Sequence, residues 1–466
     1  MNIDLDKINK IYFIGIGGTS MSGLALMSKI NGKEVTGSDM RANSYTEKLE
    51  KNGIKVNIGH HRENITDDID LIVYSAAIRE NNPERVEGKN KGILEVERKI
   101  FLGVLSTFYK RTVAVSGTHG KTTTSSLLSL VFLNADMDPS ISVGGTIKKI
   151  NGNSRVGDSD YFVIEACEFV DSFLYSRHFV GTIQNIEEDH LDYFTGGISQ
   201  IKESFRKFAE ITPEEGLLVV NGDDPNVLDI LDGLKCPIVK VGLGSGNDFI
   251  AENITYDELG RPSFDVYKNG EFYHSFDLII PGEHNVLNAL SVVAVSDFFE
   301  IDRDVVAESF REFTGAKRRF EKRGEINGIT VIEDYAHHPT ELRVTINACK
   351  NYRHDKLFVI FQPHTYSRTY LLFDEFVDAM KEADEVVLND IYSDREDNEW
   401  DIYSEDIAEK VREKFGIPAR VYSEFDDITD YVVAKAKEGD FILVAGSQSI
   451  NQVAYDIVDK LKRIYE

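Results

Sequence analysis

A glycine-rich turn at residues 117–123 constrains this chain more than any other stretch. It consists of Gly117, Thr118, His119, Gly120, Lys121, Thr122 and Thr123. A β-branched apolar run at 112–116 precedes the turn, and residues 124–131 have the composition of an amphipathic helix. This order of strand, turn and helix predicts an anion site, because the first backbone N–H groups of a helix have no partner inside the helix and point outward.

The side chains of the turn favour a nucleoside triphosphate with Mg²⁺. Gly117 and Gly120 allow the backbone to approach a phosphate closely. Lys121 supplies a positive charge for the terminal phosphates, and Thr122 offers a hydroxyl to a magnesium ion. The turn is an abbreviated form of the common phosphate-binding pattern, since Val115 stands where that pattern begins with glycine. The competing interpretation is a chance Gly-Lys-Thr turn.

Length and charge limit the classes of protein that are possible. A chain of 466 residues predicts about three domains. The 79 acidic and 52 basic residues give a net charge of −27, which argues against nucleic acid and anionic membranes as partners. Three widely spaced cysteines and the lack of an apolar run of about 20 residues favour a cytoplasmic protein without membrane insertion. Both a monomer and a homodimer are compatible with the sequence.

The N-terminal region predicts a Rossmann-like domain. An apolar strand at 11–16 runs into a glycine turn. Gly15, Gly17 and Ser20 nearly reproduce the dinucleotide-binding fingerprint, with Ser20 in place of the third glycine. Asp39 follows about 20 positions later, where ribose recognition requires an acidic residue. By itself this pattern indicates an NAD(P)-dependent oxidoreductase. Any nucleotide diphosphate, however, can use the same helix N-terminus.

A third strand-like run, 71–74, ends at Ser75. Ligands of doubly wound sheets lie at the carboxyl ends of the strands, so Ser75 is a candidate binding residue. A helix cap is the equally weighted alternative for this serine. The pattern breaks after residue 100, and we place the first domain boundary between residues 107 and 108.

The central region contains several strands that end in acidic or amide groups. In a parallel sheet these ends meet at one edge, next to the phosphate turn. Glu165, after the strand 161–164, is the first choice for a magnesium ligand, and His190 is a candidate for a second ion. The alternative for each acid is a helix cap or a solvated turn. Asp224, which precedes Pro225, is predicted to be such a cap.

Residues 247–280 predict an antiparallel addition of short strands with Gly- and Asn-containing turns. A helix follows from Pro281, and Asn285 and Asn288 would share one face near its start. Amides in this position can bind an adenine edge, whereas capping of the helix by Asn285 is the equally weighted alternative.

The α/β pattern resumes beyond the second boundary, which we place between residues 322 and 323, just after three successive cations. Strand-like runs at 329–332 and 357–361 lead to three histidines, His337, His338 and His364. Adjacent histidines point in different directions and no cysteine completes a site, so zinc is disfavoured. Recognition of a small carboxylate by Arg368 is the favoured interpretation.

Eight motifs in order carry a resemblance to a known family. They are Gly-Ile-Gly-Gly-x-x-Met-Ser-Gly, Gly-Thr-His-Gly-Lys-Thr-Thr-Thr, Glu-Ala-Cys-Glu, Asn-Ile-Glu-x-Asp-His-Leu-Asp-Tyr, His-Asn-x-x-Asn-Ala, Arg-Arg-Phe-Glu, Asp-Tyr-Ala-His-His-Pro-Thr-Glu and Phe-Gln-Pro-His-x-Tyr-Ser-Arg. Over nearly its whole length the chain resembles the ATP-dependent Mur ligases of peptidoglycan precursor synthesis. The resemblance implies an α/β fold of three domains: a Rossmann-like domain (1–107), a central parallel-sheet domain with a phosphate loop (108–322) and a C-terminal α/β domain (323–466).

The resemblance also implies roles for individual residues. The first domain would hold a UDP-sugar through Gly17, Gly18, Ser20, Asp39 and Ser75. Mg-ATP would bind at 117–123, with the metal on Thr122, Glu165 and His190 and with further ATP contacts from Asn285, Asn288, Arg319 and Asp334. L-Alanine would bind to Tyr335, His337, His364 and Arg368. Lys121, Glu165, His190 and His337 would be the catalytic groups.

The implied reaction is amide formation between the lactyl carboxylate of UDP-N-acetylmuramate and L-alanine. It would proceed through an acyl phosphate and release ADP and phosphate, with one or two Mg²⁺ ions as cofactor. Two alternatives remain open at this stage. One is a ligase of the same family that joins a tripeptide to the same UDP-sugar during murein recycling, and the other is the NAD-dependent oxidoreductase.

Overall fold

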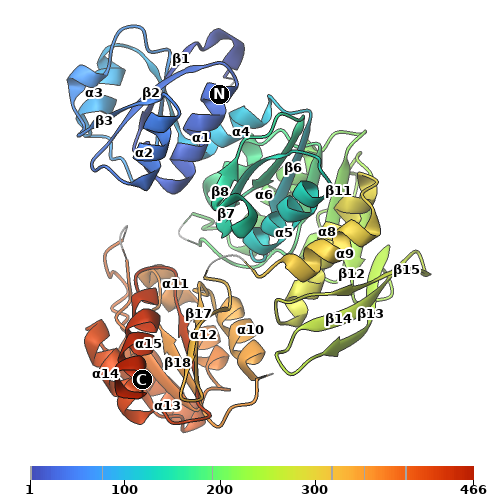
Figure 1. The fold of residues 1–466 in the computed structure, drawn as a ribbon, viewed down its shortest axis with the longest axis vertical. Coiled ribbons are helices and arrows are strands. Elements are labelled where there is room, and N and C mark those ends of the chain that lie inside the picture. Colours follow the sequence, from blue (N-terminus) through green and yellow to red (C-terminus); the bar gives the residue numbers. More distant parts are fainter. Residues whose placement is uncertain are drawn as a thin grey trace. The chain divides into compact units, whose positions relative to one another are not determined.

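The computed structural model describes residues 3–75, 77–191, 193–315, 318–350, 352–393 and 396–465 (Figure 1). The chain divides into two compact units. The first unit comprises Met1–Ile186, Lys202–Asp248 and Ser291–Ser309, and the second comprises Glu187–Ile201, Phe249–Leu290 and Phe310–Glu466.

The N-terminal part of the first unit is a parallel sheet with the order β3-β2-β1-β4-β5. Its strands are β1 (Lys10–Ile14), β2 (Glu34–Asp39), β3 (Lys55–Ile58), β4 (Leu71–Tyr74) and β5 (Leu94–Glu97). The helices between and after them are α1 (Thr19–Ile30), α2 (Ser44–Lys51), α3 (Pro83–Asn90) and α4 (Arg98–Ser106). Strand order reverses between β1 and β4, which is where doubly wound sheets bind their ligands. The predicted Rossmann-like fold is confirmed.

The first unit also contains the sheet that carries the phosphate turn, with the order β12-β11-β10-β6-β9-β7-β8. Its strands are β6 (Arg111–Ser116), β7 (Ser140–Ile147), β8 (Gly152–Arg155), β9 (Tyr161–Glu165), β10 (Val180–Ile183), β11 (Leu217–Asn221) and β12 (Ile238–Gly242). All neighbours are parallel except β7 and β8. Helices α5 (Lys121–Asn134), α6 (Ile198–Ile211) and α7 (Pro225–Leu228) complete this part. Asp224 caps α7 through the N–H groups of Asn226 and Val227, as predicted.

The prediction that residues 124–131 form an amphipathic helix is wrong in one respect. Helix α5 forms, but every residue from Thr124 to Phe132 is buried. The sheet covers one side of the helix, and Asn134 at the end of α5 donates to the Ser309 hydroxyl at 2.9 Å. Phe132 packs edge-on against Phe299, with ring centroids 5.5 Å apart. A helix enclosed in this way needs apolar and small residues all around rather than one apolar stripe.

The second unit begins its sheets with an antiparallel meander, which confirms the prediction for residues 247–280. Its strands are β13 (Phe249–Tyr256), β14 (Pro262–Lys268) and β15 (Glu271–Asp277). Helices α8 (Glu283–Phe298) and α9 (Arg303–Glu312) follow in the chain, and their residues from Ser291 to Ser309 belong to the first unit.

The C-terminal sheet has the order β16-β17-β21-β18-β19-β20. Its strands are β16 (Glu321–Ile326), β17 (Ile329–Asp334), β18 (Leu357–Phe361), β19 (Glu385–Asn389), β20 (Ala419–Tyr422) and β21 (Phe441–Ala445). The helices are α10 (Pro339–Lys350), α11 (Tyr366–Leu371), α12 (Phe373–Ala379), α13 (Ser404–Phe415), α14 (Phe425–Lys435) and α15 (Asn451–Tyr465). Only β16 is antiparallel to its neighbour. Two apolar cores lie on opposite faces of the strands, one with α10, α12 and α13 and one with α14 and α15.

Among the helices of the described residues, none combines the length and the apolar character that a membrane crossing requires.

Candidate active site

The phosphate turn lies between β6 and α5 and depends on its two glycines. Gly120 is the residue before α5 and has φ 81°, and Gly117 has φ 137°. Both values lie in the region that favours glycine. A Cβ at Gly117 would also come within 2.8 Å of the Gln184 Cβ. The turn therefore approaches β10 so closely that a side chain is excluded.

Asn185 holds the turn in this shape. The Thr118 N–H donates to the Asn185 carbonyl oxygen at 3.1 Å, and the His119 N–H donates to Asn185 Oδ1 at 2.7 Å. The Asn185 amide in turn donates to the His119 carbonyl at 3.2 Å. These three hydrogen bonds preorganise the backbone that precedes α5.

Lys121 is folded over the turn in a buried ion pair. Its ammonium donates to the carbonyl oxygens of Gly117 (2.5 Å) and Thr118 (2.9 Å) and lies 3.0 Å from Glu168 Oε2. Burial would lower the pKa of Lys121, but the Glu168 carboxylate and its acidic neighbours outweigh burial and raise it. Lys121 is therefore cationic at neutral pH. Glu168 is the last residue of the Glu-Ala-Cys-Glu motif, but the motif alone does not show that it pairs with Lys121.

Thr122 and Glu165 converge at one point, as expected of two ligands of a hard cation. A Cβ built on Gly144 would lie 2.6 Å and 2.7 Å from the Glu165 carboxylate oxygens and 2.9 Å from Thr122 Oγ1. The Gly144 N–H donates to Glu165 Oε2 at 2.8 Å. A hydroxyl and a carboxylate beside the phosphate turn suit Mg²⁺, which takes oxygen ligands. Thr122 and Glu165 belong to the first unit, whereas His190 belongs to the second. The role of His190 as a metal ligand therefore stays a prediction.

The glycine turn of the N-terminal sheet is closed by Asp39. The Gly17 N–H donates to Asp39 Oδ2 at 2.9 Å, and the Asn43 amide donates to the Gly17 carbonyl at 3.2 Å. Asp39 thus connects the end of β2 to the start of α1, and its second oxygen is 3.4 Å from the Arg41 N–H.

Ser75 does not cap a helix, so that alternative is wrong. The next helix, α3, begins only at Pro83 and is capped by Asn82. The Ser75 hydroxyl instead lies beside Gly15, at 3.3 Å from the position of a Cβ there. This places Ser75 at the point where the strand order reverses between β1 and β4.

Asn285 and Asn288 lie inside the first turns of α8, and the capping alternative for Asn285 is also wrong. The Asn285 amide donates to the Pro281 carbonyl at 2.7 Å, whereas a cap would accept a hydrogen bond from a backbone N–H. The Asn288 amide donates to Asn285 Oδ1 at 3.0 Å. The two amides therefore orient each other, as their spacing predicted.

Asp334 is the last residue of β17 and accepts two backbone hydrogen bonds. Its two carboxylate oxygens accept from the N–H groups of Phe320 (2.6 Å) and Ala336 (2.7 Å). Burial raises the pKa of Asp334 from 3.8 to about 6, although Arg319 and the two N–H donors oppose this change. The Arg319 guanidinium lies 5.2 Å from the centre of the Tyr335 ring, which is cation–π distance.

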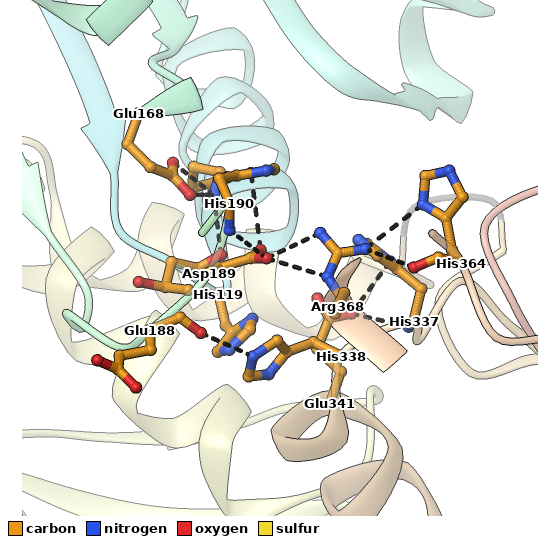
Figure 2. A network of polar contacts seen from close by, with 12 residues as sticks. His119, Glu168, Glu188, Asp189, His190, His337, His338, Glu341, His364 and Arg368 are labelled. Carbon is orange, nitrogen blue, oxygen red and sulfur yellow. Dashed lines mark hydrogen bonds and ion pairs between the residues drawn. The ribbon is translucent and has the colours of Figure 1, made fainter. Parts of the chain in front are cut away.

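Arg368 forms a buried ion pair with Asp189, an acid that the sequence analysis did not assign. Figure 2 shows the guanidinium between Asp189 and His364. Its Nε and Nη2 atoms donate to Asp189 Oδ1 at 3.1 Å and 2.8 Å. A small pocket adjoins the pair, and its lining includes His190, Thr365 and Ser367. Its lining offers a guanidinium and hydroxyl groups, which are the kinds of group that bind a carboxylate.

The adjacent histidines turn to different partners, as the sequence predicted. His338 Nε2 lies 3.0 Å from the Glu188 carbonyl (Figure 2). His337 Nδ1 lies 3.0 Å from the Tyr335 carbonyl. A carbonyl only accepts, so Nδ1 of His337 carries the proton and Nε2 has the lone pair. Burial lowers the pKa of His337 to about 4, so the neutral form dominates at pH 7. The His337 and His364 rings are 6.0 Å apart.

A glycine-rich turn with a buried lysine, beside a hydroxyl and a carboxylate, is typical of a nucleotide-dependent enzyme. A second glycine turn, at Gly17, follows a strand of the N-terminal sheet. A pocket lined by Arg368 and His190 lies in the second unit. Residues 10–110 match the Mur ligase family catalytic domain, 115–296 the Mur ligase middle domain and 318–448 the glutamate ligase domain of Mur ligases. The chain belongs to the Mur ligase family.

Individual relatives agree with this assignment over nearly the full length. The chain is 47% identical to a UDP-N-acetylmuramate–L-alanine ligase of Clostridium botulinum, over 96% of this chain and 97% of the relative. A solved UDP-N-acetylmuramate–alanine ligase of Thermotoga maritima superposes with a TM-score of 0.80 at 29% identity, covering 98% and 99% of the two chains. A murein peptide ligase of Psychrobacter arcticus gives 0.69 at 25% identity, with coverage of 97% and 98%.

Proposed function

We propose that this protein is an ATP-dependent ligase that joins the lactyl carboxylate of UDP-N-acetylmuramate to L-alanine and releases ADP and phosphate. The observation that carries the proposal is the 47% identity, over almost all of both chains, to a UDP-N-acetylmuramate–L-alanine ligase. The buried Lys121, the converging oxygens of Thr122 and Glu165, and the small pocket at Arg368 support it chemically.

Three domains divide the substrates between them. Residues 1–107 bind the UDP-sugar through Gly17, Gly18, Ser20, Asp39 and Ser75. Residues 108–322 bind ATP through the turn 117–123, assisted by Asn285, Asn288 and Arg319, and residues 323–466 contribute Asp334 to ATP and the alanine pocket. The protein works in the cytoplasm as a monomer or a homodimer, without nucleic acid.

The first step transfers the γ-phosphoryl group of ATP to the lactyl carboxylate. A carboxylate oxygen attacks phosphorus, the bond to the β-phosphate oxygen breaks, and an acyl phosphate and ADP result. Lys121 neutralises charge on the transferring group, and the N–H groups before α5 hold the phosphates in line. Thr122 and Glu165 would hold a magnesium ion, and His190 would be available to a second ion. Such an ion would add to the charge stabilisation of the transferring group.

The second step forms the amide. The uncharged amine of L-alanine attacks the acyl carbon, and phosphate leaves from the tetrahedral intermediate. His337 is suited to accept the amine proton at Nε2, because its Nδ1 is already committed to the Tyr335 carbonyl. His190 is the other candidate for this proton. Arg368, His364 and Tyr335 hold the alanine carboxylate and orient its amine.

The similarity to a murein peptide ligase keeps one second candidate, a ligase that adds a tripeptide to the same UDP-sugar. One assay separates the two. ADP release is measured with UDP-N-acetylmuramate and ATP while the amine is varied among L-alanine, other amino acids and the tripeptide. Release that depends on L-alanine supports the proposal, and release with the tripeptide alone overturns it. A change in NADH absorbance would favour the oxidoreductase.

A further inference from the structure

Arg98 occupies a distinctive place in the first unit. It is the first residue of α4 and is half-buried. Its Nη1 atom donates to the Ser20 hydroxyl at 3.1 Å, so this arginine touches the glycine turn at the start of α1. Within the described parts of the chain, no acidic side chain forms an ion pair with Arg98. The neighbouring Lys99, in contrast, pairs with Glu97 at 3.1 Å.

An unmatched guanidinium is notable in a protein with 79 acidic and 52 basic residues. A half-buried cation has lost part of its hydration, and without an ion pair the Ser20 hydroxyl compensates that loss only in part. Its planar donors are instead available to an anionic ligand, and guanidinium groups bind phosphate oxygens in bidentate fashion.

Arg98 also lines a cavity that leads to the predicted carboxylate-activating site. One wall of this cavity comes from the first two turns of α4, including Arg98 and Lys99. The opposite wall comes from the end of β9 and the following segment, including Glu165 and Cys167. Arg98 therefore contacts the glycine turn at Ser20 and also lines the cavity beside Glu165.

The position of α4 is fixed by close packing within the first unit. A Cβ at Gly103 would overlap the backbone of Tyr175, so α4 touches the 3-10 segment Phe169–Tyr175 without an intervening side chain. The Arg177 N–H also donates to the Ser106 hydroxyl at 2.8 Å. These contacts hold Arg98 in place relative to Glu165.

We propose that Arg98 binds the sugar-side phosphate of the UDP-sugar and directs the rest of that substrate into the cavity beside Glu165. This inference rests on the proposed function. The uridine-side phosphate lies on the N–H groups of the glycine turn, and the sugar-side phosphate receives the guanidinium. The sugar and its lactyl carboxylate then extend along the wall formed by α4 and reach the end of β9.

Binding of UMP and UDP tests this assignment, because only UDP has the second phosphate. Calorimetric titration of Arg98→Ala and Arg98→Gln should show a Kd for UDP and UDP-N-acetylmuramate that is raised about 10- to 100-fold, as expected for lost charge-assisted hydrogen bonds. The Kd for UMP should change less than about twofold. Arg98→Gln keeps a donor for Ser20 but no charge, so it separates phosphate recognition from a purely structural contact. Arg62→Ala, an exposed arginine of the same sheet domain, is the matched control.

Each outcome supports or contradicts the assignment. Equal loss of UMP and UDP binding, or UDP binding restored by Arg98→Gln, would mean that Arg98 only supports the turn. Unchanged UDP binding in both variants contradicts the proposed role of Arg98 but leaves the proposed function intact. Wild-type protein that binds no uridine nucleotide contradicts the proposed function as well. Unchanged ADP affinity of the variants shows that the phosphate turn remains folded.

Discussion

The guanidinium of Arg368 is bound to the carboxylate of Asp189 by two hydrogen bonds, and both side chains are at least nine-tenths buried. A residue predicted to bind the alanine carboxylate thus already has a carboxylate partner in the protein. Asp189 fixes the guanidinium plane, and the Nη1 atom, which points to His364 at 3.4 Å, faces the other way. We infer that Asp189 positions Arg368 for its substrate.

Removal of Asp189 should therefore destabilise the second unit. Asp189→Ala leaves a buried arginine without an acidic partner, which costs about 3–5 kcal/mol. Trp400 is the single tryptophan of the chain and belongs to this unit, so its fluorescence in urea reports the change. Glu375→Ala, an exposed acid on α12, should change the unfolding free energy by less than about 0.5 kcal/mol. A stability of Asp189→Ala equal to that of this control would show that the pair is not buried in solution.

Lys121 provides a prediction about the phosphoryl-transfer step. Lys121→Ala should lower alanine-dependent ADP release by at least about 100-fold, because the charge that develops on the transferring group loses its neutralising ammonium. Binding of the UDP-sugar should be intact. Lys110→Ala, whose side chain is 82% exposed, is the control. Equal loss of UDP-sugar binding and ADP release in Lys121→Ala would contradict the assigned roles.

Glu165 and Thr122 predict a metal dependence. Glu165→Gln should raise the Mg²⁺ concentration needed for half-maximal activity by about tenfold or more, since one charged ligand becomes a neutral one. Thr122→Val keeps the shape and removes the hydroxyl, so it should have a smaller effect in the same direction. Titrations with Mn²⁺, read by electron paramagnetic resonance in the presence of ATP, measure metal binding without turnover. Unchanged Mn²⁺ affinity in both variants would exclude these residues as ligands.

Asp334 predicts a pH dependence. Its pKa is raised from 3.8 to about 6, so the folded state binds this proton more tightly than the unfolded state. The contribution of Asp334 to the unfolding free energy is therefore largest below about pH 4 and is lost as the pH rises through about 6. Carboxyl-¹³C NMR of labelled aspartate, compared with Asp334→Asn, should show one resonance that titrates near 6. If the resonance that is missing from Asp334→Asn titrates near 4 instead, this prediction is contradicted.

Much of the fold follows from local sequence pattern. The uninterrupted apolar runs 71–74 and 357–361, for example, predict two strands, and their bounds are those of β4 and β18. The strands that escaped prediction are short, polar or interrupted, among them β3 (Lys55–Ile58) and β8 (Gly152–Arg155). Such segments become strands because neighbouring strands supply hydrogen-bond partners, which is a non-local effect.

The candidate site was predictable where a residue's chemistry lies in its own motif. The turn at 117–123 is one example, and the convergence of Thr122 with Glu165 follows from the edge at which parallel strands end. Partners from distant segments were not predictable. Glu168 lies 47 residues from Lys121, and Asp189 lies 179 residues from Arg368. Both acids stand within quoted motifs, but only the folded chain shows which cation each one binds.

The central claim is that L-alanine is the amine that this enzyme joins to UDP-N-acetylmuramate. It is tested most directly by ADP release from purified protein with ATP, Mg²⁺ and UDP-N-acetylmuramate, with and without L-alanine. We predict that ADP release requires both the UDP-sugar and L-alanine, and that the product gains the mass of one alanine residue. ADP release that does not depend on L-alanine, or that requires the tripeptide instead, would contradict this account.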